Sequence, residues 1–130
     1  MYSIGDIEFV NQYDYSDGTE GNNHLFVIID SQETDNIAIS MDYFGMLISS
    51  QIHKSRETSK FKYNIFLKKD AQNGLNCDSI VKTDELYTFN NNNIVMKIGT
   101  VDPEDVEEFI NNFRDFLTEI SETENLQNQC

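Results

Sequence analysis

Cysteine, histidine and proline are scarce in this chain of 130 residues, and the first two scarcities exclude whole classes of site. The two cysteines, Cys77 and Cys130, cannot form the framework of a disulfide-rich domain and are expected to be free thiols. The only histidines, His24 and His53, have no cysteine close to them in the sequence. The sequence therefore predicts no metal site and no other cofactor.

Long apolar runs are also missing. No apolar stretch approaches the roughly 20 residues of a membrane-spanning helix. The first twenty residues are acidic and hold no apolar block of the kind that a signal peptide needs. We therefore expect a protein of the cytoplasm with no membrane partner.

Basic residues are few, since nine Lys and Arg stand against 23 Asp and Glu and leave a formal net charge of −14. Residues 1–53 contain no Lys or Arg, whereas residues 54–69 hold six of the nine cations. A surface this acidic repels a nucleic-acid backbone and favours basic protein partners. Residues 54–69 could still contact single-stranded RNA, or they could form a strand edge protected by lysines.

The pattern of apolar residues indicates a mainly β fold with a C-terminal helix. We expect strands at residues 2–10, 25–29, 37–41, 45–51, 61–68, 79–89 and 94–101, with polar loops at 11–23, 31–36, 52–60 and 70–78 and a turn at 90–93. Asp102 and Pro103 suit the N-cap and the first position of a helix. Its apolar stripe consists of Val106, Phe109, Ile110, Phe113, Phe116, Leu117 and Ile120. The sequence predicts one domain over residues 1–120, a small curled sheet or barrel of six or seven strands, and a disordered polar tail at 121–130.

Several short motifs follow one another in a characteristic order. They are Gly5-Asp6-Ile7, the strand from Leu25 to Asp30, Ile48-Ser49-Ser50-Gln51, and the segment 78–108. This order resembles the MazF/PemK toxins of toxin-antitoxin systems. The resemblance implies an SH3-like barrel of the MazF/PemK/CcdB kind, a homodimer, an antitoxin as partner, and metal-independent cleavage of single-stranded RNA through the ribose 2′-hydroxyl.

The chain departs from active members of that family where the chemistry lies. Active members have an Arg, normally followed by Pro, at the start of the second strand, and a Thr shortly before the Gln. Here these positions are Asn23, His24 and Ser49. Losing a group that stabilises the developing charge typically costs about 10²- to 10³-fold in rate. His24 is not expected to replace the Arg, because adjacent strand residues point to opposite faces.

One hypothesis is a metal-independent endoribonuclease that has kept its activity. Its catalytic candidates are Ser49, His53, Asn23 and His24, and its RNA-binding candidates are Gln51, Lys54, Arg56 and Lys60. A continued strand would place Ser49, Gln51 and His53 on one face, where His53 could act as general base. Aromatic residues such as Tyr13, Tyr15, Tyr43 and Phe44 could stack bases, although in a barrel they more often pack in the core.

The second hypothesis is a non-cleaving protein whose acidic surface imitates nucleic acid. Such a surface would bind and inhibit a basic nucleic-acid-handling protein, as phage inhibitors of CRISPR or restriction nucleases do. The candidate partner-binding residues are Asp14, Asp17, Glu20, Glu104, Asp105, Glu107 and Glu108. The missing Arg together with the net charge favours this second hypothesis.

Overall fold

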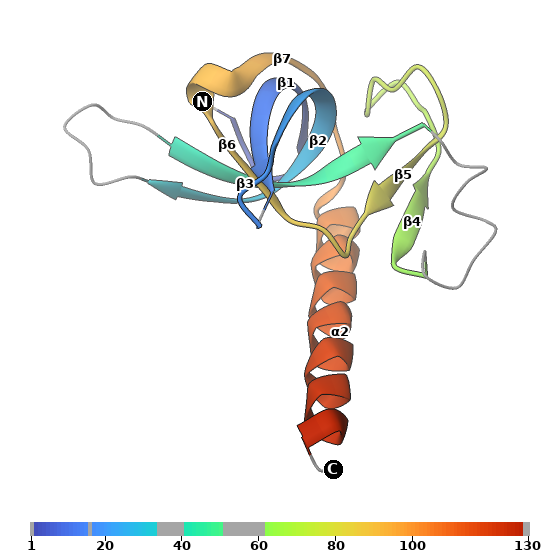
Figure 1. Cartoon of the computed structure of the whole chain (residues 1–130). Helices are drawn as coiled ribbons and strands as arrows, with labels where there is room; N and C mark the ends of the chain where they lie inside the picture. The colour runs from blue at the N-terminus through green and yellow to red at the C-terminus, as the bar shows by residue number, and fades with distance from the viewer. Residues whose placement is uncertain (1, 16, 34–40, 51–61, 129–130) are drawn as a thin grey trace.

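The structure is a computed structural model that describes residues 2–15, 17–33, 41–50 and 62–128 (Figure 1). In these residues seven strands precede one long helix. The elements are β1 (Asp6–Tyr15), β2 (Glu20–Glu33), β3 (Met41–Ser49), β4 (Asn64–Leu67), β5 (Ser79–Lys82), β6 (Tyr87–Asn90), the 3₁₀ turn η2 (Asn91–Asn93), β7 (Ile94–Thr100) and α2 (Pro103–Asn128). The predicted mainly β fold with a C-terminal helix is confirmed.

The sheet curls into a barrel. Antiparallel pairing joins β1 to β2, β2 to β3, β3 to β6 and β6 back to β1, so these four strands form a closed circuit. β7 lies along β1, while β5 pairs with the end of β3 and β4 pairs with β5. Closure satisfies the backbone groups that an open sheet would leave at its edges.

Strand β2 runs through the centre of the molecule. Phe26 and Ile28 point into one apolar cluster, which also contains Tyr43 and Phe89. Their neighbours Val27 and Ile29 point into a second cluster on the opposite face. The prediction of a strand buried on both faces is therefore confirmed, and so is the expectation that Tyr43 packs in the core, where it is fully buried.

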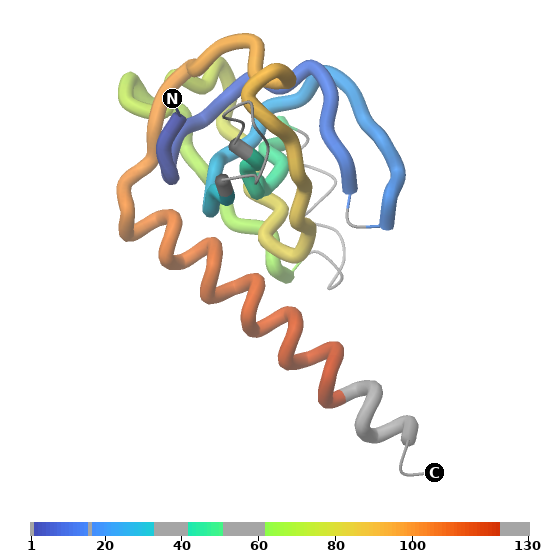
Figure 2. The backbone as a smooth tube through the Cα atoms, turned by 90° about the vertical axis from the view of Figure 1, so that its left-hand side faces the viewer, coloured from blue at the N-terminus to red at the C-terminus, as the bar shows by residue number. Residues whose placement is uncertain are grey.

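Helix α2 covers the second cluster with its first turns. The backbone carbonyl of Asp102 accepts the first helical hydrogen bond, from Val106 N–H at 3.2 Å, and the buried side chains of Val106 and Phe109 join the cluster. Further along, Leu117 and Ile120 are exposed. Figure 2 shows that the helix begins against the barrel and then extends away from it.

The polar loop predicted at residues 11–23 is largely wrong. β1 and β2 form a long hairpin in which Gln12 pairs with Asn22 and Asp14 pairs with Glu20. Strand pairing uses backbone groups, so a polar composition does not prevent it. Of the described residues, only 17–19 lie in the turn, where Gly18 adopts a φ of +91°.

Other boundaries also differ from the predicted ones. Met41–Ser49 is one strand, and it includes residues 42–44 that were expected to separate two strands. Residues 79–89 are two strands, because the chain turns after Lys82 and β5 and β6 pair with different parts of β3. β4 is shorter than predicted, and residues 31–33, expected in a turn, extend β2. Residues 34–40 and 51–61, which carry other predicted segments, lie outside the described residues.

Candidate functional site

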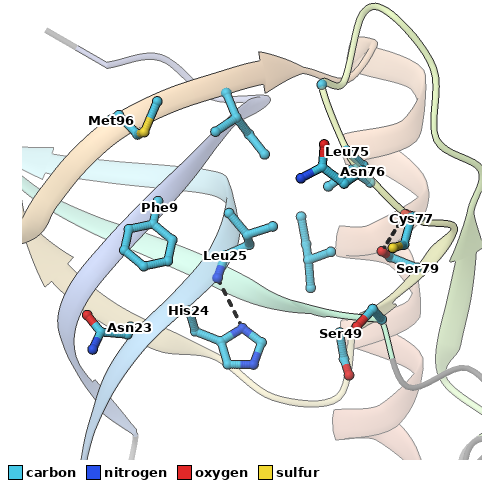
Figure 3. A pocket seen from close by; sticks show the side chains of 14 residues that line it. Phe9, Asn23, His24, Leu25, Ser49, Leu75, Asn76, Cys77, Ser79 and Met96 are labelled. Carbon is cyan, nitrogen blue, oxygen red and sulfur yellow. Dashed lines mark hydrogen bonds between the residues drawn. The ribbon is translucent and has the colours of Figure 1, made fainter.

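A cavity of about 500 Å³ opens where β2, β3 and β7 meet the loop that precedes β5 (Figure 3). The residues that line it are Phe9, Asn23, His24, Leu25, Ile48, Ser49, Ser50, Gly74, Leu75, Asn76, Cys77, Ser79, Met96 and Ile98. Its lining combines apolar side chains, such as Leu25 and Leu75, with amide, hydroxyl and imidazole groups. Three of the four predicted catalytic candidates, Asn23, His24 and Ser49, therefore share one cavity.

Asn23 and His24 both line the cavity although they are neighbours in β2. Figure 3 shows that the two side chains nevertheless extend in different directions, so the expectation that His24 does not replace the Arg stays a prediction. Asn23 has a φ of +56°, a left-handed conformation that interrupts the regular alternation of a strand. Asparagine tolerates this conformation better than most residues, so the local sequence allows the irregularity.

His24 is held in one orientation by its own strand. Its Nδ1 accepts a hydrogen bond from the N–H of Leu25 at 3.0 Å, and its ring centroid lies 6.1 Å from that of Phe26. Burial lowers the pKa of His24, and the positive charge of Lys82 adds to this effect, while the hydrogen bond with Leu25 acts in the opposite direction. A neutral imidazole whose Nδ1 accepts carries its proton on Nε2. His24 therefore presents a donor rather than a base.

Ser49 ends β3, opposite Ile80 of β5, and is half-buried in the cavity wall. Nearby, the Ser79 hydroxyl donates a hydrogen bond to the carbonyl of Cys77 at 2.9 Å. Cys77 itself is exposed at the cavity, as a free thiol. The serine hydroxyls can both donate and accept hydrogen bonds.

The sequence did not reveal that residues 74–77 belong to this site. Their loop is held by Asn73, whose buried side-chain oxygen accepts hydrogen bonds from the N–H groups of Asp70 and Leu75 at 3.0 and 3.1 Å. The pattern Asp70-x-x-Asn73-Gly74, with Gly74 at a φ of +68°, is a recognisable turn signal. The signal indicates a fixed loop but not what the loop faces.

The remaining predicted RNA-site residues, Gln51, His53, Lys54, Arg56 and Lys60, lie outside the described residues. Of the described residues that line the cavity, none is Lys or Arg. No group of His, Cys, Asp and Glu in the described ranges is arranged to hold a metal ion. The described lining of the cavity therefore combines apolar side chains with polar ones and contains no Lys, Arg, Asp or Glu.

The predicted partner-binding acids fall into two groups. Asp14, Asp17 and Glu20 lie on the β1–β2 hairpin, and Glu104, Asp105, Glu107 and Glu108 lie on the first turns of α2. All are exposed except Asp105, which is half-buried. Figure 2 shows the hairpin end and the start of α2 on opposite sides of the barrel. The two groups therefore belong to different faces.

The fold and the site define a small closed β-barrel with a C-terminal helix. Beside its central strand lies a cavity whose described lining contains no Lys, Arg, Asp or Glu. Residues 4–117 match the family described as PemK-like, MazF-like toxin of type II toxin-antitoxin system, and the chain belongs to this family. The resemblance seen in the sequence is thereby confirmed, and an antitoxin is the class of partner that the family suggests. No curated protein matches the chain. None of the described helices is long and apolar enough to span a membrane.

Proposed function

We propose that this chain is a non-cleaving member of the toxin family that binds a basic protein through its acidic surface. One observation carries the proposal: the described lining of the cavity contains no Lys or Arg, and Nδ1 of its one histidine is already occupied by Leu25 N–H. Cleavage through the ribose 2′-hydroxyl needs a base for that proton and positive charge near the phosphate.

Asn23 stands where active members of the family have an Arg. Its amide has no charge and lacks the paired N–H donors with which a guanidinium forms bidentate hydrogen bonds to a phosphate. Its neighbour His24 could act as a base in only two ways. Either Nδ1 gives up the hydrogen bond that it accepts from Leu25 N–H, or the proton moves from Nε2 so that Nε2 can accept one. These requirements favour a cavity that has lost the cleavage reaction.

The charge of the chain supports a basic partner. A net charge of −14 speeds association with a cationic protein and slows it with RNA. The two acidic groups, on the hairpin and on α2, offer faces on which such a protein could dock. A nucleic-acid-handling protein suits best, because its own groove is cationic. An antitoxin with a basic segment is a second partner of the same chemistry.

Retained RNA cleavage is the second candidate, and a specific observation favours it. His24 and Ser49 line the same cavity, and the charge of Lys82 acts on His24. Lys82 could supply the missing positive charge if RNA bound there. This candidate predicts that His24→Ala, Ser49→Ala and Lys82→Met each reduce cleavage.

The first experiment incubates the purified chain with a long single-stranded RNA in the presence of EDTA. We expect no cleavage above the buffer control. Discrete cleavage that His24→Ala or Ser49→Ala removes would overturn the proposal and establish the second candidate. A Glu108→Gln variant, altered on the exposed face of α2, serves as the control for handling and nuclease contamination.

The second experiment tests the partner. Purified basic DNA-binding proteins are bound to labelled duplex DNA, and the chain is added at increasing salt. We expect displacement of the DNA at low salt, lost as the salt is raised. Changing Glu104, Glu107 and Glu108 to Gln should weaken it, whereas Asn11→Gln, at an exposed neutral residue, should not. Displacement of the DNA that depends neither on salt nor on these substitutions would contradict the proposal.

The homodimer implied by the family stays a prediction, which light scattering would test.

A further inference from the structure

A second cavity, of about 380 Å³, lies at the far end of the β1–β2 hairpin. Its walls are the rings of Tyr13, Tyr15 and Tyr87, and Glu85 and Glu20 also line it. It shares no lining residue with the first cavity. Its volume lies within the roughly 300–1,000 Å³ typical of ligand sites.

The three rings are fixed by strand pairing. Tyr15 of β1 pairs directly with Tyr87 of β6, and their ring centroids are 5.0 Å apart at an interplanar angle of 53°. Tyr13 meets Tyr87 nearly at a right angle, 83°, with centroids 5.3 Å apart. Gly21 pairs with Tyr13, and a β-carbon at Gly21 would clash with the Tyr13 ring. The ring therefore lies over bare backbone, and the aromatic walls are in place before any ligand arrives.

A carboxylate is fixed against these rings. The Tyr87 hydroxyl donates a hydrogen bond to Oε2 of Glu85 at 2.7 Å. Glu85, Tyr13 and Tyr87 line the same cavity. Burial and then the charge of Glu85 raise the pKa of Tyr13. The Glu85–Tyr87 hydrogen bond leaves Oε1 of the carboxylate able to accept a further donor.

Negative charge continues along the rim. Glu20 lines the cavity and pairs across the hairpin with Asp14. Like charges directly opposite each other destabilise a β-ladder, so the hairpin holds this arrangement at a cost. No described residue that lines the cavity is Lys or Arg. The site therefore combines aromatic faces, a fixed carboxylate and a negative rim, and such a combination attracts a cation.

We infer that this cavity binds the guanidinium of an arginine side chain presented by a basic protein partner. The planar guanidinium can stack on a tyrosine ring while its N–H groups bond to Glu85. A nucleotide would bring a phosphate against the negative rim, so stacked RNA is disfavoured here. The partner's identity as a basic protein rests on the proposed function, whereas the cation site itself does not.

The probe is N-acetyl-L-arginine N-methylamide, titrated into the full chain while the tyrosine ring resonances are followed by NMR. The matched ligand is the citrulline analogue, which has the same shape and no charge. We expect the arginine compound to shift the ring resonances of Tyr13, Tyr15 and Tyr87, and to bind about tenfold more tightly than the citrulline compound. Equal binding of the two ligands would overturn the inference.

Two variants test the residues. Glu85→Gln keeps an acceptor for Tyr87 but removes the charge, and should weaken arginine binding about tenfold. Glu122→Gln removes a charge from the exposed surface of α2 instead, at a residue with no proposed binding role, and should leave arginine binding unchanged. If Glu85→Gln perturbs the fold, as its amide spectrum would reveal, Tyr15→Leu replaces it and should weaken binding several-fold. Unchanged affinity in a folded Glu85→Gln or Tyr15→Leu variant would overturn the inference.

Other occupants give different results. Tighter binding of a lysine analogue than of the arginine compound would overturn the assignment to arginine. A gain in affinity on Arg56→Ala would overturn the assignment to a partner, because the chain's own guanidinium would then be the occupant. Arginine binding without displacement of DNA from basic proteins would refute only the proposed function. Displacement without arginine binding would refute only this site.

Discussion

Glu8 offers the sharpest test of the packing inside the barrel. Its side chain is fully buried on β1, and neither carboxylate oxygen has a hydrogen-bond partner in the described part of the chain. Burial, followed by the negative charge of Asp6, raises the pKa of Glu8 from 4.5 to about 7, while Lys97 acts in the opposite direction. The negative charge of Glu8 in turn contributes to raising the pKa of Tyr43, although burial contributes more.

This raised pKa fixes the sign of a pH effect on stability. Between pH 4.5 and about 7 the folded chain holds a proton on Glu8 that the unfolded chain has lost. The free energy of unfolding therefore falls as the pH rises through this window, and the contribution of Glu8 is fully present only below it. Since each pKa unit corresponds to about 1.4 kcal/mol, the loss amounts to about 3 kcal/mol at pH 8.

The assay is urea unfolding of the wild type and of Glu8→Gln at several values between pH 5 and 8. The buried amide of the variant has the same cost at every pH, so the comparison is between the slopes of stability against pH. Relative to the wild type, the variant should gain about 2.5 kcal/mol between pH 5 and 8. Lys97→Met should raise the pKa of Glu8 further, because it removes the cation that lies 3.2 Å from Asp6.

Glu108→Gln, at an exposed position, is the control and should follow the pH dependence of the wild type. A constant difference in stability between Glu8→Gln and the wild type across the range would refute the reasoning. Carbon-13 NMR of the Glu8 carboxyl gives an independent check. A titration midpoint near 4.5 would mean that the side chain is hydrated rather than buried.

Two further predictions concern the loops. Gly99→Ala should lower the free energy of unfolding in urea by about 3 kcal/mol, because the new β-carbon would clash with the backbone of residues 72–73. Gly18→Ala should lower it by only about 1 kcal/mol, through its positive φ, because nothing lies within 4 Å of the new β-carbon. Equal losses in the two variants would contradict the close approach at Gly99. Asn90→Ala should lower the free energy of unfolding by about 1 kcal/mol, because the Asn90 side chain caps η2 by accepting a hydrogen bond from the N–H of Asn92 at 2.9 Å. Asn92→Ala, at an exposed position, should leave it nearly unchanged in the same assay.

Apolar patterning predicted the central elements because burial imposes it. The continuous run at residues 25–29 indicated a strand buried on both faces, and the spacing after Pro103 indicated the helix. The polar end of the hairpin could not be predicted this way. Its strands are held by backbone pairing and by rings such as Tyr13 packed over Gly21, which a pattern of polar and apolar residues does not encode.

The candidate site was predicted only in part for a related reason. The resemblance to the toxin family pointed to Asn23, His24 and Ser49, and these residues do share a cavity. The positive φ of Asn23 and the bond between His24 and the Leu25 N–H were not predictable, because both depend on local backbone geometry. The tyrosine cavity was missed because its walls come from β1 and β6, which are far apart in the sequence.

The most direct test of the proposed loss of cleavage is a single-turnover assay with the chain in excess over a single-stranded RNA, in EDTA. A matched RNA in which every 2′-hydroxyl is replaced by hydrogen reports any cleavage that does not use this group. We predict that the cleavage rate of the unmodified RNA equals that in buffer alone. Faster cleavage of the unmodified RNA alone, abolished by Ser49→Ala and kept by Glu85→Gln, would show that the cavity is a working nuclease site.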